Sequence, residues 1–453
     1  MLHKFEFDGS RVVLDVHSGV VHVVDELVWT LLDDCRQMSG ESIVQKHSNK
    51  YSTIEILEAL AEIKDLEAKG LLFCADPCRE LYKPSREFEV KSLCLHLAHS
   101  CNLRCRYCFA GQGRFGGSDE LMPADTGRRA LDFLLARSGG RRHLEVDFFG
   151  GEPLMNFAVL QELVAYGRQR GCEAGKEFKF TLTTNALLLD EIVAQYLNEE
   201  NISVVLSLDG RREVHDAMRP KPGGAGSYDV VLARIKDFVN SRDGVNYIIR
   251  GTYTRHNTDF CADVLHLADM GFEHLSIEPV VAPADAWYSI REKDLPLLIA
   301  QYELLTRELL RRRRAGNPFS FFHFNIDLNG GPCLPKRLTG CGAGHEYMAV
   351  APNGDIYPCH QFVGREDYLL GNVSGENLND SLISVFRAAH VYNKETCTGC
   401  WARFFCSGGC HANAEMSNGS ILEPYSIGCV LARKRLECAI YLKTMEPVLQ
   451  KNI

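Results

Sequence analysis

Three cysteines stand close together in the segment His99-Ser100-Cys101-Asn102-Leu103-Arg104-Cys105-Arg106-Tyr107-Cys108-Phe109, at a CxxxCxxC spacing. The neighbouring arginines favour the thiolate form of these cysteines. A single tetrahedral metal ion requires four ligands, so three thiolates alone do not complete its shell. An iron–sulfur cube held by three cysteines keeps one iron free for a ligand from outside the protein. The spacing therefore indicates a cluster with an open iron. A zinc site with His99 as fourth ligand, or three thiols crowded in a loop, are the alternatives.

This spacing resembles the signature of the radical S-adenosylmethionine (SAM) superfamily. The resemblance implies that the amine and carboxylate of SAM bind the free iron, with Tyr107 among the cofactor contacts. It also implies that the reduced cluster cleaves SAM to a 5′-deoxyadenosyl radical, which then abstracts hydrogen from the substrate.

The composition narrows the class of protein. The chain has 453 residues, 45% of them hydrophobic, and a net charge of −9. This mild acidity argues against a nucleic-acid partner, which requires a basic face. No apolar run approaches the roughly 20 residues that span a membrane, and residues 1–5 lack a signal-peptide core. We therefore expect a cytoplasmic protein with no membrane partner, whose 18 cysteines are metal ligands or free thiols.

Strand and helix patterns alternate from Ser92 to about Val281. The expected strands cover residues 93–97, 143–149, 178–184, 202–208, 247–253 and 274–280, and the expected helices cover 124–136, 157–168, 190–198, 228–239 and 260–270. A long helix over 294–314 follows. This alternation predicts a parallel sheet with ligand chemistry at the carboxyl ends of its strands. Six units are too few for a closed eightfold barrel, so we expect an α/β fold with an open, partial (β/α)6 barrel.

Loops that follow these strands carry candidate cofactor-binding residues. They are Gly150, Gly151, Glu152, Pro153, Asn185 and Ser207. Two glycines let the backbone approach a ligand closely, and Glu152 can take a cation. The first four resemble the GGEP motif of the superfamily, which contacts the SAM amino group; the other two are implied contacts to the ribose or methionine end. A tight turn, and polar caps of the next helices (Asp209 among them), are the alternatives.

Arg219 resembles the arginine that pairs with the SAM carboxylate in several members of the superfamily. A fixed guanidinium fork suits a carboxylate. A surface ion pair is the alternative. The sequence identifies no catalytic base.

Seven cysteines near the end of the chain follow the order C, GxxxxC, CxxCxxxxxCxxxC and C. They are Cys341, Cys359, Cys397, Cys400, Cys406, Cys410 and Cys429. This order resembles the SPASM domain, which adds two auxiliary 4Fe–4S clusters to radical SAM enzymes that act on peptides and proteins. By position, the resemblance implies an outer cluster held by Cys397, Cys400, Cys406 and Cys429, and an inner cluster held by Cys341, Cys359 and Cys410.

Cys333 is a candidate eighth ligand. Its distance from Cys341 differs from that in fully ligated members of the family, so we expect Cys333 not to be a ligand and the inner cluster to keep an open iron. A zinc site of Cys397, Cys400, Cys406 and Cys410 is the alternative, and it leaves the other three cysteines unexplained. The remaining cysteines are expected to be small buried residues: Cys35, Cys74, Cys78, Cys94, Cys172, Cys261 and Cys438.

Residues 1–82 are expected to form a separate module. The runs 12–16 and 20–24 predict a β-hairpin, and helical patterns follow at 26–35 and 54–69. This order resembles the winged-helix-like, PqqD-like element that binds a leader peptide as an added strand at a sheet edge. A structural cap or a DNA-binding winged helix is the alternative.

Together these resemblances divide the chain into a PqqD-like leader-peptide recognition domain (1–82), a radical SAM core (88–315) and a SPASM domain (316–453). The whole chain resembles the maturases of six-cysteine (SCIFF) peptides, which form sactipeptide-type thioether crosslinks. This implies three 4Fe–4S clusters, SAM, a ribosomally made cysteine-rich precursor peptide with a leader, and a reductant such as flavodoxin or ferredoxin. Sulfatase-maturase oxidation of Cys or Ser to formylglycine is the second hypothesis, and an iron–sulfur electron carrier or redox sensor is the third.

Overall fold

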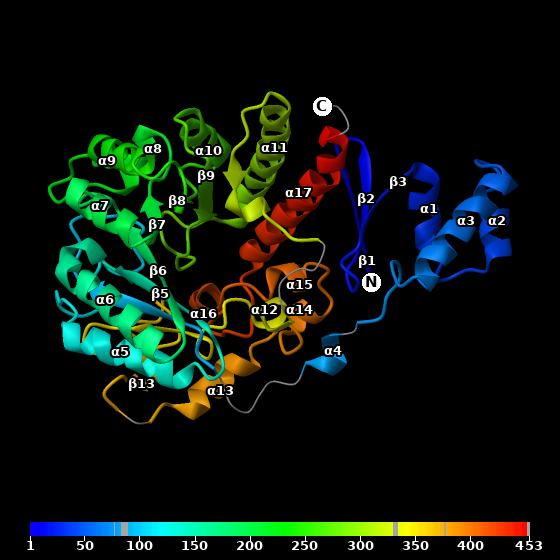
Figure 1. Cartoon of the computed structure of the whole chain (residues 1–453). Coiled ribbons are helices and arrows are strands. Elements are labelled where there is room, and N and C mark those ends of the chain that lie inside the picture. Colours follow the sequence, from blue (N-terminus) through cyan, green and yellow to red (C-terminus); the bar gives the residue numbers. More distant parts are fainter. Residues whose placement is uncertain (77, 83–88, 329–333, 376, 451–453) are drawn as a thin grey trace.

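The computed structural model describes residues 1–76, 78–82, 89–328, 334–375 and 377–450. A ten-stranded sheet forms its centre, in the order β10-β9-β8-β7-β6-β5-β4-β11-β12-β13 (Figure 1). The six central strands are β4 (Ser92–Ala98), β5 (His143–Gly150), β6 (Glu177–Thr184), β7 (Ser203–Ser207), β8 (Tyr247–Tyr253) and β9 (His274–Pro279). They follow one another in the sheet as in the chain, and every pair is parallel. The expected open (β/α)6 arrangement is confirmed.

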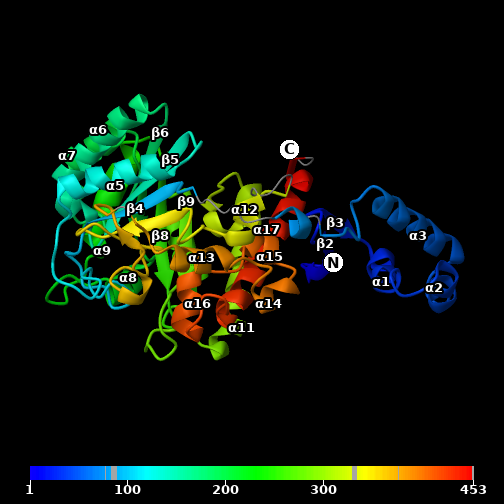
Figure 2. The ribbon, with the colours of Figure 1, turned by 90° about the horizontal axis from the view of Figure 1, so that it is seen from below.

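Helices line the outside of this curved sheet (Figures 1 and 2). They are α5 (Ala124–Arg137), α6 (Phe157–Glu173), α7 (Glu191–Glu199), α8 (Arg212–Met218), α9 (Tyr228–Asn240), α10 (Phe260–Asp269) and α11 (Leu295–Arg314). Their apolar faces pack on strand side chains that are fully buried, such as Val146, Leu182 and Ile249. Only α8 was not expected from the sequence, because two turns are too short to show a helical period.

The segment after α11 extends the same sheet at both ends. β10 (Ser320–Phe321) pairs in parallel with β9, and β11 (Tyr347–Val350) pairs in parallel with β4. β12 (Asp355–Tyr357) and β13 (Gly371–Asn372) then continue the sheet as antiparallel strands. The other elements of this segment are α12 (Leu334–Thr339), α13 (Asp380–Ala388), α14 (Glu395–Thr398), α15 (Arg403–Cys406), α16 (His411–Asn418) and α17 (Ser426–Gln450). Among the helices described, none is long and apolar enough to cross a membrane.

The first residues form a separate antiparallel sheet of β1 (Leu2–Phe7), β2 (Ser10–Asp15) and β3 (Val21–Val24), in that order. The helices α1 (Glu26–Asp34), α2 (Gly40–His47) and α3 (Thr53–Ala68) follow and project to one side of the molecule (Figure 1). The predicted hairpin is β2–β3, whereas β1 and α2 were not expected. Short turns of helix also occur at α4 (Cys78–Leu81) and at η1 (Pro153–Asn156), η2 (Glu292–Asp294), η3 (Phe322–Phe324) and η4 (Glu366–Tyr368).

The two faces of this small sheet pack against different partners. Val13 belongs to a core shared with Leu31 of α1 and Leu60 of α3. The opposite face meets α17, where the Phe7 ring stacks on the Tyr441 ring at 4.4 Å between centroids. The module is therefore fixed to the body of the protein through α17.

Candidate active site

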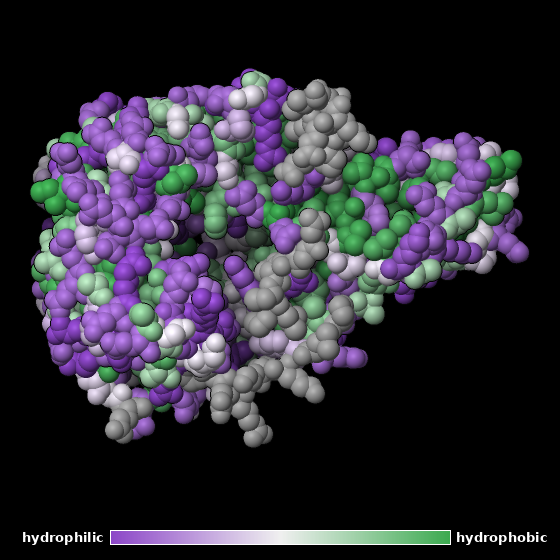
Figure 3. Space-filling model, viewed as in Figure 1, coloured by the Kyte–Doolittle hydropathy of each residue, from purple (hydrophilic) through white to green (hydrophobic). Residues whose placement is uncertain are grey.

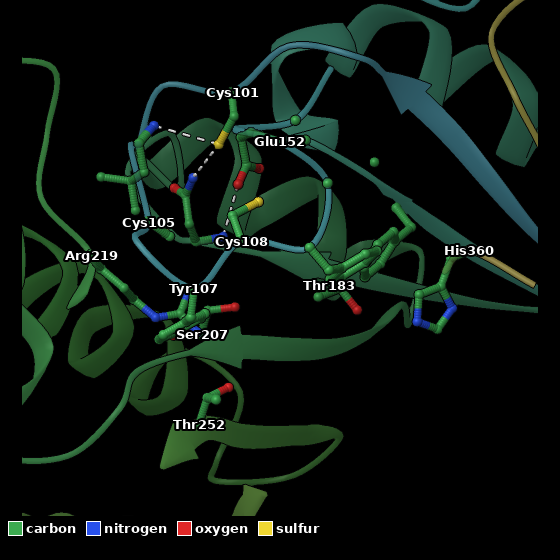
Figure 4. A pocket seen from close by; sticks show the side chains of 18 of the residues that line it. Cys101, Cys105, Tyr107, Cys108, Glu152, Thr183, Ser207, Arg219, Thr252 and His360 are labelled. Carbon is green, nitrogen blue, oxygen red and sulfur yellow. Dashed lines mark hydrogen bonds between the residues drawn. The ribbon is translucent and has the colours of Figure 1, made fainter. Parts of the chain in front are cut away.

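A cavity opens at the carboxyl ends of the central strands (Figure 4). It holds about 1160 Å³ of empty space, part of which is open to solvent. Figure 3 shows the surface hollowed between β8 and α17, beside this region. The residues predicted to hold the first cluster and SAM line the cavity with one exception. Those that line it are Cys101, Cys105, Tyr107, Cys108, Gly150, Gly151, Glu152, Asn185, Ser207 and Arg219. Pro153 is the exception, because it starts the helical turn η1 and is buried outside the cavity wall.

The cysteine loop, residues 99–109, is held on one side by the loop after β5. Gly151 N donates to Ala98 O at 2.7 Å, and Glu152 N donates to Ser100 O at 2.9 Å. A Cβ atom on Gly150 would lie 2.4 Å from Ala98 O, and one on Gly151 would lie 2.2 Å from Ser100 O. The two glycines were expected to admit a ligand. Both line the cavity, and the atoms that a Cβ at either position would meet are backbone atoms that lead into the cysteine loop.

On its other side the cysteine loop is held by the segment after α8. Arg104 N donates to Pro220 O and Arg106 N donates to Met218 O, each at 2.8 Å. Since both contacts are made by backbone atoms, they fix the path of the loop independently of the side chains at these positions. The three thiols thus lie together at one end of the cavity, opposite His360 (Figure 4).

The donor set fits an iron–sulfur group. Burial raises the pKa of Cys101 to about 12 and that of Cys105 to about 11, so the nearby arginines do not keep the metal-free thiols ionised as expected. A bound metal does deprotonate a coordinating thiol. Leu103 N and Asn185 Nδ2 donate to Cys101 Sγ at 3.5 and 3.7 Å. Such hydrogen bonds to sulfur tune iron–sulfur clusters.

Glu152 is buried and its carboxylate is occupied by hydrogen bonds from the protein. It accepts from Thr184 Oγ1 at 2.7 Å, from Asn185 N at 2.8 Å and from Leu154 N at 3.1 Å. Burial nevertheless raises the pKa of Glu152 to about 7, because these bonds only partly offset the loss of water. Glu152 therefore joins the ends of β5 and β6 at the wall of the cavity.

Asp209 is a functional candidate that the sequence analysis took for a helix cap. It is fully buried, and its Oδ2 accepts from Tyr107 OH at 2.6 Å and lies 3.0 Å from Arg219 Nε. Its Oδ1 accepts from Thr252 N at 3.0 Å. The residue at the N-cap of α8 is Arg211. Asp209 thus holds Tyr107 and Arg219 in place, and Arg219 also lines the cavity.

Sequence reasoning missed further polar residues of the wall, among them Arg250, Thr252, Glu278 and His360. Thr183, which belongs to the same polar stretch as Asn185, also lines the wall. All but His360 lie near the carboxyl ends of central strands, and Arg250 Nη2 donates to Glu278 Oε2 at 2.6 Å. The rule that gave Asn185 and Ser207 would have found Thr252 and Glu278 if it had been extended to the carboxyl ends of β8 and β9.

The alternative fourth ligand His99 does not line the cavity. Its Nε2 lies 3.1 Å from His96 Nδ1, and its ring stacks on Phe115 at 4.7 Å. Within the described residues, no three His, Cys, Asp or Glu side chains are grouped so as to hold a single metal ion.

The cysteines of the last segment fall into two groups by their mutual electrostatic effects. Burial raises the pKa of Cys359, and the charges of Cys410 and Cys341 raise it further. Burial likewise raises the pKa of Cys429 to about 11, with added effects of Cys406, Cys397 and Cys400. These are the two sets that the sequence assigned to the inner and the outer cluster. Cys410 acts on Cys359 together with Cys341, as the inner set requires.

The other cysteines follow the expectation only in part. Cys78, Cys94, Cys261 and Cys438 are buried, Cys35 and Cys74 are half-buried, and Cys172 is exposed on α6. Cys333 lies outside the described residues.

Comparison with known proteins identifies the family. Residues 95–256 match the model of the radical SAM superfamily, and residues 341–401 match SPASM, an iron–sulfur cluster-binding domain. An uncharacterised protein of Methanocaldococcus jannaschii is 32% identical over 70% of this chain and 96% of its own length. The chain therefore belongs to the radical SAM superfamily and carries a SPASM domain. Membership of this superfamily indicates that the protein is an enzyme that binds SAM and iron–sulfur clusters.

Two further relatives have named activities. A cysteine-type anaerobic sulfatase-maturating enzyme of Clostridium novyi is 24% identical over 70% of this chain and 86% of its own. Mycofactocin maturase MftC of Mycobacterium ulcerans is 27% identical over 75% of this chain and 88% of its own.

Two solved structures share the fold. The structure of anSMEcpe with bound AdoMet has a TM-score of 0.65 and 22% identity, over 80% of this chain and 100% of its own. Streptococcus suis SuiB bound to precursor peptide SuiA has a TM-score of 0.53 and 19% identity, over 92% of this chain and 96% of its own. A match over 92% of the chain extends into the first module.

We predict that Gly150→Ala displaces the cysteine loop and lowers the iron content of the purified protein. The added Cβ overlaps Ala98 O, and the φ of +125° is already unfavourable for alanine. The control is Gly271→Ala, where φ is +91° but a Cβ meets nothing within 4 Å. The control should cost only about 1–2 kcal/mol of unfolding free energy and keep its iron. Equal iron content in both variants would contradict the predicted role.

We also predict a pH-dependent penalty from Glu152 in the metal-free protein. Folding raises its pKa from 4.5 to about 7, so the folded state retains a proton that the unfolded chain loses. Stability should therefore fall as pH rises from about 4.5 to 7, by about 1.4 kcal/mol per unit of pKa shift. Glu152→Gln should flatten this slope in denaturant unfolding, whereas Glu62→Gln on the exposed side of α3 should keep it. A Glu152→Gln variant with the original slope would refute the assignment.

Proposed function

We propose that this enzyme installs intramolecular thioether crosslinks, from Cys sulfur to carbon, in a ribosomally synthesised cysteine-rich peptide. The proposal includes the division into a PqqD-like leader-recognition domain (1–82), a radical SAM core (88–315) and a SPASM domain (316–453). Named relatives that mature proteins or peptides, and a related fold seen with a bound precursor peptide, support a peptide substrate.

The observation that carries the proposal is the free edge of β3. No described strand pairs with the outer side of β3. Asp15 N donates to Val20 O, and alternate residues of an antiparallel pair bond to each other, so Val20, His22 and Val24 face β2. The backbone N–H groups of Val21 and Val23 therefore point away from the sheet, where an added peptide strand would find them.

The surroundings of this edge suit a peptide with apolar side chains. The Val23 side chain is 59% exposed, and Leu27 of α1, the helix that follows β3 directly, is only half-buried. Figure 3 shows hydrophobic surface over β3 and α1. A sulfatase maturase that reads a motif in its protein substrate does not require such an edge.

In the proposed site Cys101, Cys105 and Cys108 hold the cluster that binds SAM. The bound pair supplies a 5′-deoxyadenosyl radical that removes a hydrogen atom from the substrate. Tyr107, Gly150, Gly151, Glu152, Asn185, Ser207 and Arg219 line the same cavity and are the proposed cofactor contacts. Arg219 keeps its guanidinium in place through Asp209, which suits it to orient a carboxylate.

The two other cysteine sets are proposed to hold two auxiliary 4Fe–4S clusters, which makes three in all. Cys397, Cys400, Cys406 and Cys429 hold the outer one, and Cys341, Cys359 and Cys410 hold the inner one. Cys359 is followed directly by His360, whose ring lines the SAM cavity. The inner cluster thus belongs to the wall that faces the proposed reaction space. A flavodoxin or ferredoxin is the proposed electron donor, in the cytoplasm.

The second candidate is oxidation of a Cys or Ser side chain to formylglycine, which the sulfatase-maturating relatives support equally well. The products differ. A thioether retains the sulfur and removes one hydrogen from the thiol and one from carbon, whereas formylglycine carries an aldehyde.

Anaerobic co-expression with the peptide encoded beside this protein should give a product that has lost two hydrogens per crosslink. Fragmentation in the mass spectrometer should be blocked inside each ring, because the two chain segments stay joined through sulfur. An aldehyde that a hydrazide reagent captures would support formylglycine formation and reject the thioether.

We expect Val23→Pro to weaken leader binding at least tenfold. Proline removes an N–H that points outward and leaves the hydrogen bonds to β2 intact, which edge strands tolerate. Val23→Ala keeps that N–H and is the matched control, with a smaller loss. The affinities are measured by fluorescence anisotropy with a labelled leader peptide on the full chain. Unchanged binding by the proline variant would mean that the leader docks elsewhere.

A further inference from the structure

Lys394 is among the largest fully buried side chains of the described residues, with 0% of its surface exposed. A lysine is almost never fully buried unless its charge is compensated. It precedes α14, and its backbone oxygen accepts from Cys397 N at 2.9 Å. The residue is therefore part of the turn that positions a cysteine of the outer set.

Its side chain reaches a second turn between two other cysteines. Lys394 Nζ donates to Gly408 O at 2.8 Å, within the segment that joins Cys406 to Cys410. Gly408 has a φ of +86°, and a Cβ there would lie 3.3 Å from Nζ and 3.4 Å from Cδ of the lysine. Because glycine has no side chain at this position, the lysine side chain can occupy the space beside it. A single carbonyl satisfies one of the three N–H groups of an ammonium and does not balance its charge.

The groups near Lys394 that can carry negative charge are proposed cluster ligands. Burial lowers the pKa of Lys394, and negative charge on any of four cysteines would raise it: Cys397, Cys406, Cys410 and Cys341. Two of these belong to the outer set and two to the inner set. The buried neighbours His390 and His411 are themselves disfavoured as cations, by burial first and then by Lys394. A histidine ring is neutral or cationic, so neither ring balances the charge of Lys394.

We propose that Lys394 is a shared redox-tuning residue, whose buried ammonium raises the reduction potentials of both auxiliary clusters. The inference rests on the proposed assignment of the two cysteine sets to clusters. Reduction adds one negative charge to a cluster, and a fixed positive charge in a poorly polarisable interior favours that state. Because the lysine faces cysteines of both sets, one side chain acts on two centres. Electrons that leave the reaction space would therefore pass to two clusters whose reduction potentials are raised by the same residue.

The test is an anaerobic redox titration of the full chain with its clusters loaded, followed by electron paramagnetic resonance. Lys394→Met removes the charge with little change of length, and Lys394→Arg retains it. Lys434→Met is the control, because that lysine is also partly buried but is paired with Glu303 and Glu437. The signal that responds to added SAM marks the third cluster and serves as the internal reference.

We expect Lys394→Met to lower both auxiliary potentials, each by a change of about tenfold or more in the reduction equilibrium, or about 59 mV. The reference signal, Lys394→Arg and Lys434→Met should stay close to the original values. Unmoved auxiliary potentials in Lys394→Met, or equal shifts in Lys434→Met, would overturn the inference.

Loss of auxiliary iron from Lys394→Met alone, with Lys394→Arg fully loaded, would show that the charge is required and supports it. The same loss of iron from both variants would show that the shape of the lysine side chain matters and its charge does not. That result would overturn the inference. An original protein that lacks the iron of two auxiliary clusters would instead refute the proposed function, before either variant is compared.

Discussion

Backbone hydrogen bonds clamp the cysteine loop between two neighbouring loops, and the rest of the site depends on this clamp. Gly151 and Glu152 bond to it from the end of β5, and Met218 and Pro220 accept from it after α8. A loop held in this way keeps its three thiols together before any metal arrives. Buried backbone groups must be paired, so this path also satisfies groups that would otherwise cost stability. The small residues at 150 and 151 follow from this packing.

Three buried ionisable side chains of the described residues differ in how far the protein compensates their charge. Asp209 has an arginine, a tyrosine and a backbone N–H as partners, and Glu152 has three hydrogen-bond donors. Both are complete without a cofactor, although burial still raises the pKa of Glu152. Lys394 has one carbonyl as its hydrogen-bond acceptor and lies near cysteines of both sets. Burying an unpaired charge is costly, so its presence indicates a negatively charged partner that the cysteines would bring.

The sequence was sufficient for the central sheet because each of its strands carries two or more apolar residues, such as Phe178, Phe180 and Leu182 of β6, and the strands alternate with helical patterns. It was insufficient at the sheet edges. β10 has two residues, and β11 pairs with β4, a partner more than 200 positions earlier in the chain. Nothing local in such short segments marks them as strands. Cysteine spacing found the metal-ligand candidates because ligands must recur at set intervals along the chain.

Polar partners were harder to predict than the cysteines. Asn185 and Ser207 were found because they lie at the carboxyl ends of strands. Asp209 resembled an ordinary helix cap, since the partner that distinguishes it, Tyr107, lies 102 positions away. Lys394 gives no local signal at all, because a lysine near a cysteine is usually a surface residue and only the tertiary structure buries it.

The helix α17 connects the two regions used in the proposed reaction, which are the cysteine sets and the first module. Its first turns carry Cys429 of the outer set, and Tyr441 further along packs on β1 of the proposed leader-binding module. An α-helix advances about 1.5 Å per residue, so the two contacts lie about 18 Å apart along one rigid rod. Lys434, between them, is tied to α11 through Glu303. A leader bound at β3 would therefore be held at a constant distance from the clusters. Binding at one fixed site raises the local concentration of the rest of the peptide at the other, which lets the module assist the chemistry without contacting the reacting atoms.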